Sequence, residues 1–351
     1  MGRVVLVTGV SRELGQRFAR GLTADPDVDR VVGVDVTPPR GDLTGVQFVR
    51  ADIRNPVIAK VIAKEDVDTV VHMSVVATPD GASGRASMKE LNVIGTMQLL
   101  AACQRAAGVR HLVVKSSTTV YGASSRDPAM FTEDMAPKRL PRAGYAKDAF
   151  EVEGYVRGFA RRRPDVTVTM LRCANSIGPR ITSPLSQYFR LPVIPTVLGY
   201  DARLQFLHET DLLDVLRHAT LAGVHGTFNV AGDGVLMLSQ ALRRLGRPTL
   251  PLPGFAMSSV GSVIRQTRLA DFSPEQVAFL TYGRGVDTTA AAEVLGFRPA
   301  LTTAEAFADF VDSLGPGLVA PSRLALEAAG ALDRAAARTS ATTELTGGGR
   351  G

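Results

Sequence analysis

The glycines near the start of the chain have the spacing of a turn that binds phosphate. Residues 3–7, Arg-Val-Val-Leu-Val, are apolar without a break after Arg3, which predicts a buried parallel strand, and Gly9 and Gly15 frame the turn that follows it. A helix that begins in this turn presents unpaired N–H groups and the positive end of its dipole, which suit a pyrophosphate. The pattern Gly9-x-x-Arg12-x-x-Gly15 therefore resembles a dinucleotide-binding fingerprint in which arginine replaces the middle glycine.

The role of Arg12 has three interpretations. Its side chain is solvated in the first helical turn, or it binds the pyrophosphate as a long cation, or it reads the extra phosphate of NADP. Asp35 argues against the third interpretation, because it ends the next predicted strand, twenty residues after Gly15. Dinucleotide folds place an acid there to hold the ribose hydroxyls, and a carboxylate repels the NADP phosphate. The sequence thus favours NAD.

A second group of polar residues follows the predicted strand at residues 111–115. Residues 116–122 read Ser-Ser-Thr-Thr-Val-Tyr-Gly, and they come at the carboxyl end of the strand, where parallel sheets place their chemistry. Lys115 and Ser117 are two residues apart, so on a strand their side chains share one face. An ammonium group at this position would approach the nicotinamide end of a dinucleotide site.

The remaining pattern predicts an α/β fold, because strands alternate with helices along the chain. Such alternation implies right-handed βαβ units and a Rossmann-type, doubly wound parallel sheet with a smaller α/β substrate lobe. We predict a cofactor domain at residues 1–178 with return segments around 203–231, a substrate lobe at 179–314 and a flexible tail at 315–351. The proline-containing stretches at 191–200 and 248–255 predict loops in the substrate lobe.

Composition excludes several classes of protein. The 351 residues are 45% hydrophobic with a mean hydropathy of +0.09, and no apolar run is long enough to cross a bilayer. The net charge of +6 comes without interleaved basic and aromatic residues, so nucleic acid is not an expected partner. The five histidines are dispersed, so no metal site is expected. Two cysteines in apolar segments favour the reducing cytoplasm.

Taken in order, these motifs resemble the extended branch of the short-chain dehydrogenase/reductase superfamily. The resemblance is to its NAD-dependent epimerase/dehydratase family, and within that to a subset labelled UDP-glucose 4-epimerase-like. It runs from Val4 to about Phe310. The matching segments are Thr8 to Gly15, Asp35, Ala51 to Ile53, Val70 to His72, Asn92 to Thr96, Ser116 to Gly122, Leu171 to Arg180, Phe206 to Asp211, Asp287 to Thr289 and Leu295-Gly296.

The resemblance implies roles for individual residues. In the cofactor site, Gly9 and Gly15 shape the pyrophosphate turn, Asp35 holds ribose, Asp52 and Ile53 contact adenine, and Arg12 and Asn92 complete the set. In the catalytic site, Ser117 bonds the sugar hydroxyl whose hydrogen is removed, and Tyr145 transfers the proton. Asn175 meets the phosphates of the nucleotide sugar. A phenol with an ordinary pKa near ~10 needs that pKa lowered to act as a base at neutral pH.

The chain departs from the family pattern one helical turn after Tyr145. The pattern Tyr-x-x-x-Lys places a lysine there, which lowers the pKa of the phenol, but this chain has Ala149. Lys147 lies roughly 200° around the helix from Tyr145 and is expected to face away. Lys115 is a candidate replacement. Without a replacement cation, Tyr145 would be a poor base.

Three functions remain open at this point. The first is an NAD-dependent enzyme, an isomerase or oxidoreductase, that epimerises a nucleotide sugar at carbon 4 through a transient keto intermediate. The second is a non-catalytic sensor that binds NAD(H) or a nucleotide sugar, and the third is an NADP-dependent carbonyl reductase. The expected partners are a nucleotide sugar and a second copy of the chain in a homodimer, with neither nucleic acid nor membrane.

Overall fold

A parallel sheet forms the centre of the first lobe. The computed structural model describes residues 2–74, 84–141, 144–254, 256–257 and 273–315. The sheet has seven strands in the order β11-β6-β5-β4-β1-β2-β3, and every neighbouring pair is parallel. The strands are β1 (Arg3–Thr8), β2 (Val28–Asp35), β3 (Val46–Arg50), β4 (Thr69–His72), β5 (His111–Ser117), β6 (Thr167–Cys173) and β11 (Gly226–Val230).

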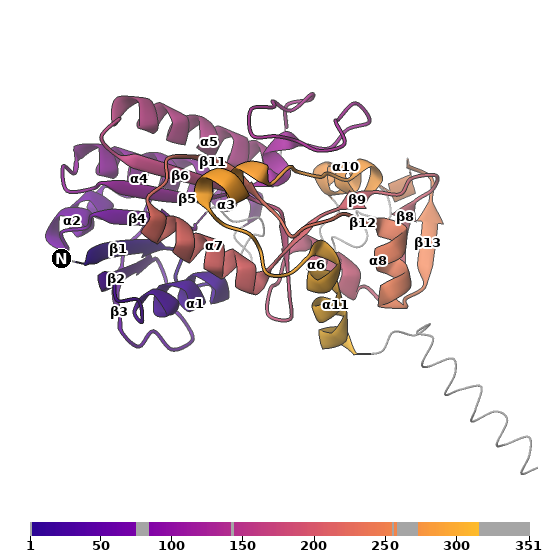
Figure 1. Cartoon of the computed structure of the whole chain (residues 1–351), viewed down its shortest axis with the longest axis horizontal. Helices are drawn as coiled ribbons and strands as arrows, with labels where there is room; N and C mark the ends of the chain where they lie inside the picture. Colours follow the sequence, from indigo (N-terminus) through magenta and orange to yellow (C-terminus); the bar gives the residue numbers. More distant parts are fainter. Residues whose placement is uncertain (1, 75–83, 142–143, 255, 258–272, 316–351) are drawn as a thin grey trace, which may run out of the picture.

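Helices cover both faces of this sheet (Figure 1). One face packs on α1 (Glu13–Leu22) and α7 (Glu209–Ala222), through side chains such as Val5 and Leu216. The other face packs on α2 (Val57–Lys64), α4 (Gly95–Arg105) and α5 (Gly144–Arg162), through side chains such as Leu6 and Val156. The short α3 (Gly84–Lys89) and the π-helical turn η2 (Glu90–Ile94) lead into α4. The predicted doubly wound parallel sheet is confirmed.

The second lobe is smaller and has its own apolar core. It contains three two-stranded sheets, which pair β7 with β10, β9 with β12, and β8 with β13. Its elements are β7 (Asn175–Ile177), α6 (Pro184–Arg190), β8 (Ile194–Val197), β9 (Arg203–Leu204), β10 (Phe206–His208), β12 (Leu236–Met237), α8 (Leu238–Leu245), β13 (Thr249–Leu252), α10 (Pro274–Tyr282) and α11 (Thr303–Leu314). Phe189, Phe206, Phe307 and Phe310 are fully buried at the centre of this lobe.

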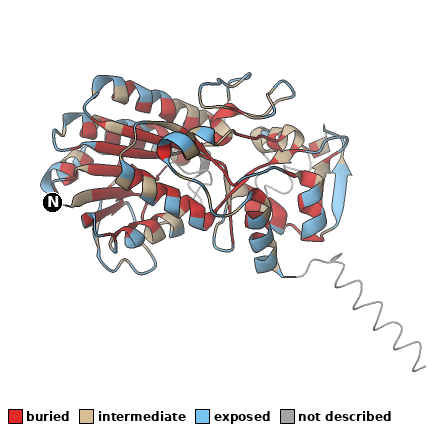
Figure 2. Ribbon diagram, in the orientation of Figure 1, coloured by how far each residue is buried: buried red, intermediate tan, exposed pale blue. Residues whose placement is uncertain are grey.

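Two stretches that were predicted to be loops are strands. β8 and β13 lie within the proline-containing stretches and pair in parallel, with Pro195 opposite Leu250 and Pro251 opposite Thr196. Proline cannot donate a ladder hydrogen bond, which is why its presence argued against strands. The prediction was wrong because β13 is an exposed edge strand, visible in pale blue in Figure 2, and an edge leaves room for a residue without an N–H group.

The chain crosses between the lobes several times. After β7, the segment 203–208 stays in the second lobe, and then α7 and β11 return to the first. Val286 and the turn η4 (Ala291–Leu295) also contribute to the first core, although the predicted boundary placed them in the second lobe. No helix among the residues described is long and apolar enough to span a membrane. The predicted tail lies outside the described residues from 316 onward.

Candidate dinucleotide and catalytic site

The turn after β1 is a tight backbone crossing. Gly9 has a φ of +83° and donates its N–H to Val34 O at 3.0 Å. A Cβ on Gly15 would lie 2.2 Å from Gly9 O, so only glycine fits where α1 starts. Arg12 is the N-cap residue of α1, and a guanidinium has no acceptor with which to cap helix N–H groups. The first turn of α1 is therefore open to an acceptor such as a phosphate, which fits a pyrophosphate.

Asp35 stands beside this turn at the carboxyl end of β2. Its two carboxylate oxygens accept the backbone N–H of Ser11 at 3.0 Å and of Val36 at 2.8 Å. These bonds hold the carboxylate rigidly against the phosphate turn. A carboxylate has about four acceptor positions, so two remain for ribose hydroxyls.

Asp52 and Ile53 follow β3 along the same edge of the sheet. Arg54 binds Asp52 at 2.7 Å and keeps the pKa of that carboxyl below its usual range. Ile53 is buried against α4, where a Cβ on Gly95 would lie 2.8 Å from its Cδ1. Their contacts with the cofactor stay a prediction.

Ser117 and Tyr145 come together although they are far apart in the sequence. Ser117 ends β5 and accepts the N–H of Thr119 at 3.2 Å, and its hydroxyl lies close enough to the Tyr145 phenol to lower the pKa of that phenol. Tyr145 lies in the first turn of α5 and is partly buried. The hydroxyl pair stands at the carboxyl end of β5, the same sheet edge as the phosphate turn.

The surroundings of Tyr145 favour its protonated form. Burial raises the pKa of the phenol most, Cys173 and the nearby carboxylates of Asp148 and Glu153 raise it further, and only part of this is offset by the hydrogen bond with Ser117. Negative charge disfavours a phenolate in the same way as desolvation does. The phenol is thus a proton donor at neutral pH in the absence of an added cation.

The helix supplies no cation at the expected place. Ala149 is 1% exposed and packs in the first core one turn after Tyr145. Lys147 extends to the outside of α5 and pairs with Glu151 at 3.7 Å, as its angular position predicted. Neither residue places positive charge beside the phenol.

Lys115 is on the same side of the sheet as Ser117. Burial lowers the pKa of its ammonium, and the charge of Arg12 lowers it further, whereas Cys173 raises it. Cys173 is the register partner of Ser117 on β6 and also interacts with Tyr145. Cys173 is thus close to both Lys115 and Tyr145 at the carboxyl end of β5 and β6.

A buried network beneath the pair was not predicted from the sequence. Glu153 accepts from Ser116 at 2.7 Å and from Arg172 at 2.8 Å, and Arg172 donates to the Tyr121 hydroxyl at 2.6 Å. Tyr121 in turn donates to Asn229 at 2.8 Å. The network ties α5 to β5, β6, β11 and the turn η3 (Thr118–Tyr121), so it fixes the elements that carry Ser117 and Tyr145.

The two predicted asparagines lie in different elements, η2 and β7. Asn92 in η2 is fully buried and donates to Asp148 on α5 at 3.2 Å. Asn175 starts β7, opposite Phe206 of β10, and is partly exposed at the border of the second lobe. Their contacts with cofactor and substrate stay predictions.

Arg284 is a candidate that the sequence reasoning missed. It is 7% exposed, donates to Gly122 O at 2.5 Å and stacks over Phe279 at 5.0 Å, and its Nε is buried without a partner. Burial lowers its pKa to about 10. The signal that could have found it is an arginine between two glycines, Gly283 and Gly285, close to the Asp287 motif.

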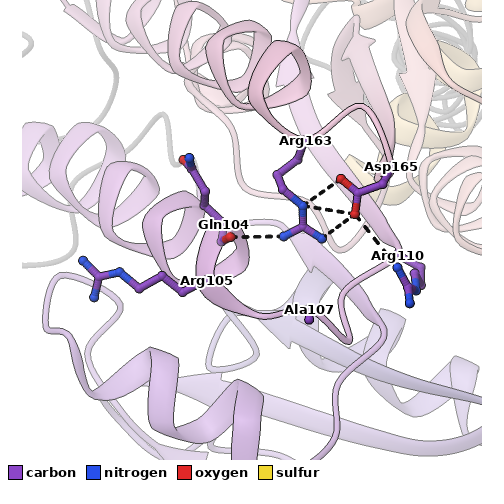
Figure 3. A pocket seen from close by; sticks show the side chains of 6 residues that line it. All are labelled: Gln104, Arg105, Ala107, Arg110, Arg163 and Asp165. Carbon is purple, nitrogen blue, oxygen red and sulfur yellow. Dashed lines mark hydrogen bonds and ion pairs between the residues drawn. The ribbon is translucent and has the colours of Figure 1, made fainter.

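The hollow in Figure 3 lies at the opposite edge of the sheet and has a volume of about 330 Å³. Its Arg163 donates to Asp165 at 2.7 Å and to the carbonyl oxygens of Cys103 and Val109. These bonds tie the end of α4 to the starts of β5 and β6, so Arg163 has a structural role there. Within the described part of the chain, no group of three His, Cys, Asp or Glu residues is arranged to hold a metal.

Comparison with known proteins identifies the family. The model of the NAD dependent epimerase/dehydratase family matches residues 5–231. The chain belongs to this family. An uncharacterized protein of Mycobacterium tuberculosis is 49% identical over 317 residues, which cover 89% of this chain and 84% of that protein. The predicted family is confirmed, and NAD is confirmed as the cofactor of the family.

Two further similar proteins are more distant. A UDP-glucose 4-epimerase of Mycolicibacterium smegmatis is 26% identical and covers 88% of this chain and 97% of its own length. The structure of a UDP-glucuronic acid 4-epimerase from Bacillus cereus, in complex with UDP-glucuronic acid and NAD, has a TM-score of 0.67 at 18% identity, over 89% of this chain and 98% of that one. At this identity the second likeness shows the fold alone.

Proposed function

We propose that the protein is an NAD-dependent epimerase that inverts carbon 4 of a nucleotide sugar through a transient keto intermediate. The observation that carries the proposal is that Ser117 and Tyr145 lie close together at the sheet edge that also carries the turn of Gly9 and Gly15. The similarity to the UDP-glucose 4-epimerase of Mycolicibacterium smegmatis supports the reaction type.

The chain's own residues divide the work. When bound, NAD accepts and returns a hydride. The turn at Gly9 and Gly15, with Arg12, holds its pyrophosphate, and Asp35 holds its adenosine ribose. Ser117 orients the sugar hydroxyl, and Tyr145 takes its proton when the alcohol becomes a ketone and gives the proton back afterwards.

Positive charge near Tyr145 is the remaining requirement. Lys115 is the chain's own candidate, because it shares Cys173 as a neighbour with Tyr145 and approaches the phosphate turn through Arg12. At that position its ammonium would hold the cofactor's ribose or phosphate and favour the phenolate at longer range. Lys115 would thus take over part of the role of the lysine that Ala149 replaces.

The substrate's diphosphate would lie between the lobes. Arg284 offers a buried cation with an unpartnered Nε, and Asn175 stands at the border of the second lobe. A guanidinium in this state suits a phosphate, because its planar donors match phosphate oxygens.

A sensor that binds NAD(H) or a nucleotide sugar without turnover is the second candidate function. The buried Ala149 and the raised pKa of Tyr145 favour it.

In both functions the protein is expected in the cytoplasm, as its two unpaired, buried cysteines suggest. The homodimer also stays a prediction. A second copy would cover exposed apolar side chains, which are Ile94 at the end of η2, Met97 in α4 and Tyr155 in α5.

Turnover decides between the two functions. The full-length protein with NAD is incubated with UDP-glucose, and formation of UDP-galactose is followed by chromatography. We expect turnover that falls about 100-fold or more in Tyr145→Phe, with unchanged NAD binding. Nucleotide-sugar binding without turnover would support the sensor, and equal rates for both proteins would contradict the role of Tyr145.

A further inference from the structure

Two neighbouring residues at the junction of β10 and α7 are bonded to different lobes. His208 ends β10, and Glu209 begins α7. The Nδ1 of His208 accepts the N–H of Thr210, so its Nε2 donates to Asp309 on α11 of the second lobe, at 3.0 Å. Glu209 accepts from Arg17 on α1 of the first lobe, at 2.9 Å. Neither residue has a role in the proposed function.

Glu209 also holds the turn through which the chain enters the second lobe. Its Oε2 accepts the backbone N–H of Arg180 at 3.0 Å, while its Oε1 accepts from the guanidinium of Arg17. The carboxylate lies so close to Gly178 that a Cβ there would be 2.6 Å from Oε2. The Glu209 side chain is 5% exposed, so salt screens these interactions little. One carboxylate therefore ties α1 to the backbone at residues 178–180.

Both segments that Glu209 joins lead to predicted ligand contacts. α1 begins at the phosphate turn, and Arg17 lies five residues after Arg12. On the other side, residues 178–180 follow β7, which begins at Asn175 and pairs in parallel with β10. β7 has three residues in a sheet of two strands, so its own ladder fixes it weakly. The place of Asn175 therefore depends on the bonds that hold the turn after β7.

An amide cannot replace the carboxylate at position 209. Two donors, the guanidinium of Arg17 and the N–H of Arg180, meet its two oxygens. Glutamine has a single acceptor oxygen, and its NH₂ group would face the second donor. Glu209→Gln therefore releases either α1 or the turn at 178–180.

Resting on the proposed function, we propose that Glu209 is a positioning residue for the nucleotide-sugar site. It fixes β7, and with it Asn175, relative to the helix that carries the cofactor's pyrophosphate. Loss of its carboxylate weakens binding of the nucleotide sugar. The NAD site keeps its affinity, because its glycine turn and Asp35 lie within the first lobe.

The ion pair of Arg30 with Glu65 provides a matched control. It has the same N–O distance as the pair of Arg17 with Glu209, 2.9 Å, and its carboxylate side chain is 6% exposed. This pair joins β2 to the end of α2, within the first lobe. Glu65→Gln therefore removes a comparably buried charge without touching the junction of the lobes. A purely structural role of Glu209 predicts the same result for both variants.

Calorimetric titration of the full-length, NAD-loaded protein tests the assignment, with UDP-glucose and the thymidine diphosphate analogue as probes. Melting temperature and NAD affinity are measured first for each variant. We expect both Glu209→Gln and Glu65→Gln to lower the melting temperature, because each leaves a buried arginine without its carboxylate. Glu209→Gln should weaken binding of the sugar nucleotide about 10-fold, and Glu65→Gln should change it less than about 2-fold. The NAD affinity should be unchanged in both.

Arg17→Met interrupts the same contact from α1, and it keeps the test decisive if Glu209→Gln does not fold. It should weaken binding of the sugar nucleotide in the same direction as Glu209→Gln. The double variant should lose no more affinity than Glu209→Gln alone, because the two residues act as one unit.

Unchanged binding in Glu209→Gln, equal losses in Glu209→Gln and Glu65→Gln, or additive losses in the double variant would overturn the positioning role of Glu209. Each of these results would leave the proposed function standing. If the wild type binds neither sugar nucleotide, the positioning role and the proposed function are both wrong.

Discussion

Ala149 leaves Tyr145 without the charge that its chemistry needs. Burial and neighbouring negative groups raise the pKa of the phenol, and Lys147 forms an ion pair with Glu151 on the outer side of α5. Tyr145 must lose its proton to act as a base. Below the pKa of such a group, the deprotonated fraction falls about tenfold for each unit that the pH is lowered. Catalysis through Tyr145 should therefore rise with pH across the neutral range.

Restoring the cation tests this directly. Ala149→Lys should increase epimerase turnover at pH 7 by about tenfold and move the rising limb of the pH–rate profile to lower pH, because positive charge favours the phenolate. Ala149→Met is the control, with similar length and no charge. Overpacking this buried position costs about 1–3 kcal/mol in either variant, so melting temperatures are compared first. An equal gain in the methionine variant would show that charge is not the cause.

Asp35 should decide the choice of dinucleotide. Its carboxylate is held by the N–H groups of Ser11 and Val36 at the place where a 2′-phosphate would lie. Fluorescence titration is expected to show tighter binding of NADH than of NADPH, and Asp35→Asn should reduce the ratio of the two affinities. Asp29→Asn, at the exposed start of the same strand, should leave this ratio unchanged. Tighter NADPH binding by the wild type would contradict the assignment.

At the scale of elements, the junction of β1 and α1 depends on one glycine. The Gly15 position has no room for a Cβ against Gly9 O, whereas a Cβ at Gly21 on the same helix meets nothing within 4 Å. Gly15→Ala should lower the free energy of unfolding by about 1–3 kcal/mol and abolish NAD binding. Gly21→Ala should raise it by about 0.5–1 kcal/mol, as alanine does in a helix.

Urea unfolding and NAD titration of both variants make the comparison. Unchanged NAD affinity in Gly15→Ala would show that α1 can move away from β1 without loss of the site. A stability loss in Gly21→Ala as large as in Gly15→Ala would mean that the close contact between position 15 and Gly9 O is not the cause of the loss in Gly15→Ala.

At the scale of the whole molecule, the second lobe depends on α11. Phe307 and Phe310 are fully buried in its core, and burial of a phenylalanine contributes about 1.5–3 kcal/mol. A chain that ends at Gly315 should keep the melting temperature and NAD affinity of the full protein. A chain that ends at Leu301 should lose cooperative unfolding of the second lobe. Loss of folding in the chain that ends at Gly315 would show that residues 316–351 are required for folding.

Much of the first lobe could be predicted from local pattern. Apolar runs such as residues 3–7 specify buried strands wherever they pack, and the glycine spacing specifies the turn, because both depend on neighbours in the chain. β13 could not be predicted in this way. Whether its proline is tolerated depends on its being at an edge, and only the partner strand decides that.

The sequence by itself determined the family, the parallel sheet, the phosphate turn with Asp35, and the absence of lysine at position 149. Tertiary structure decided which distant groups lie close together: Ser117 and Tyr145, Lys115 and Cys173, and Glu275 of α10 beside Gly144. It also left Arg284 Nε and Gln276 Nε2 buried without a hydrogen-bond partner. The physical reason is that burial, pKa and unmet hydrogen bonds belong to the assembled surroundings of a side chain, which spacing along the chain does not specify.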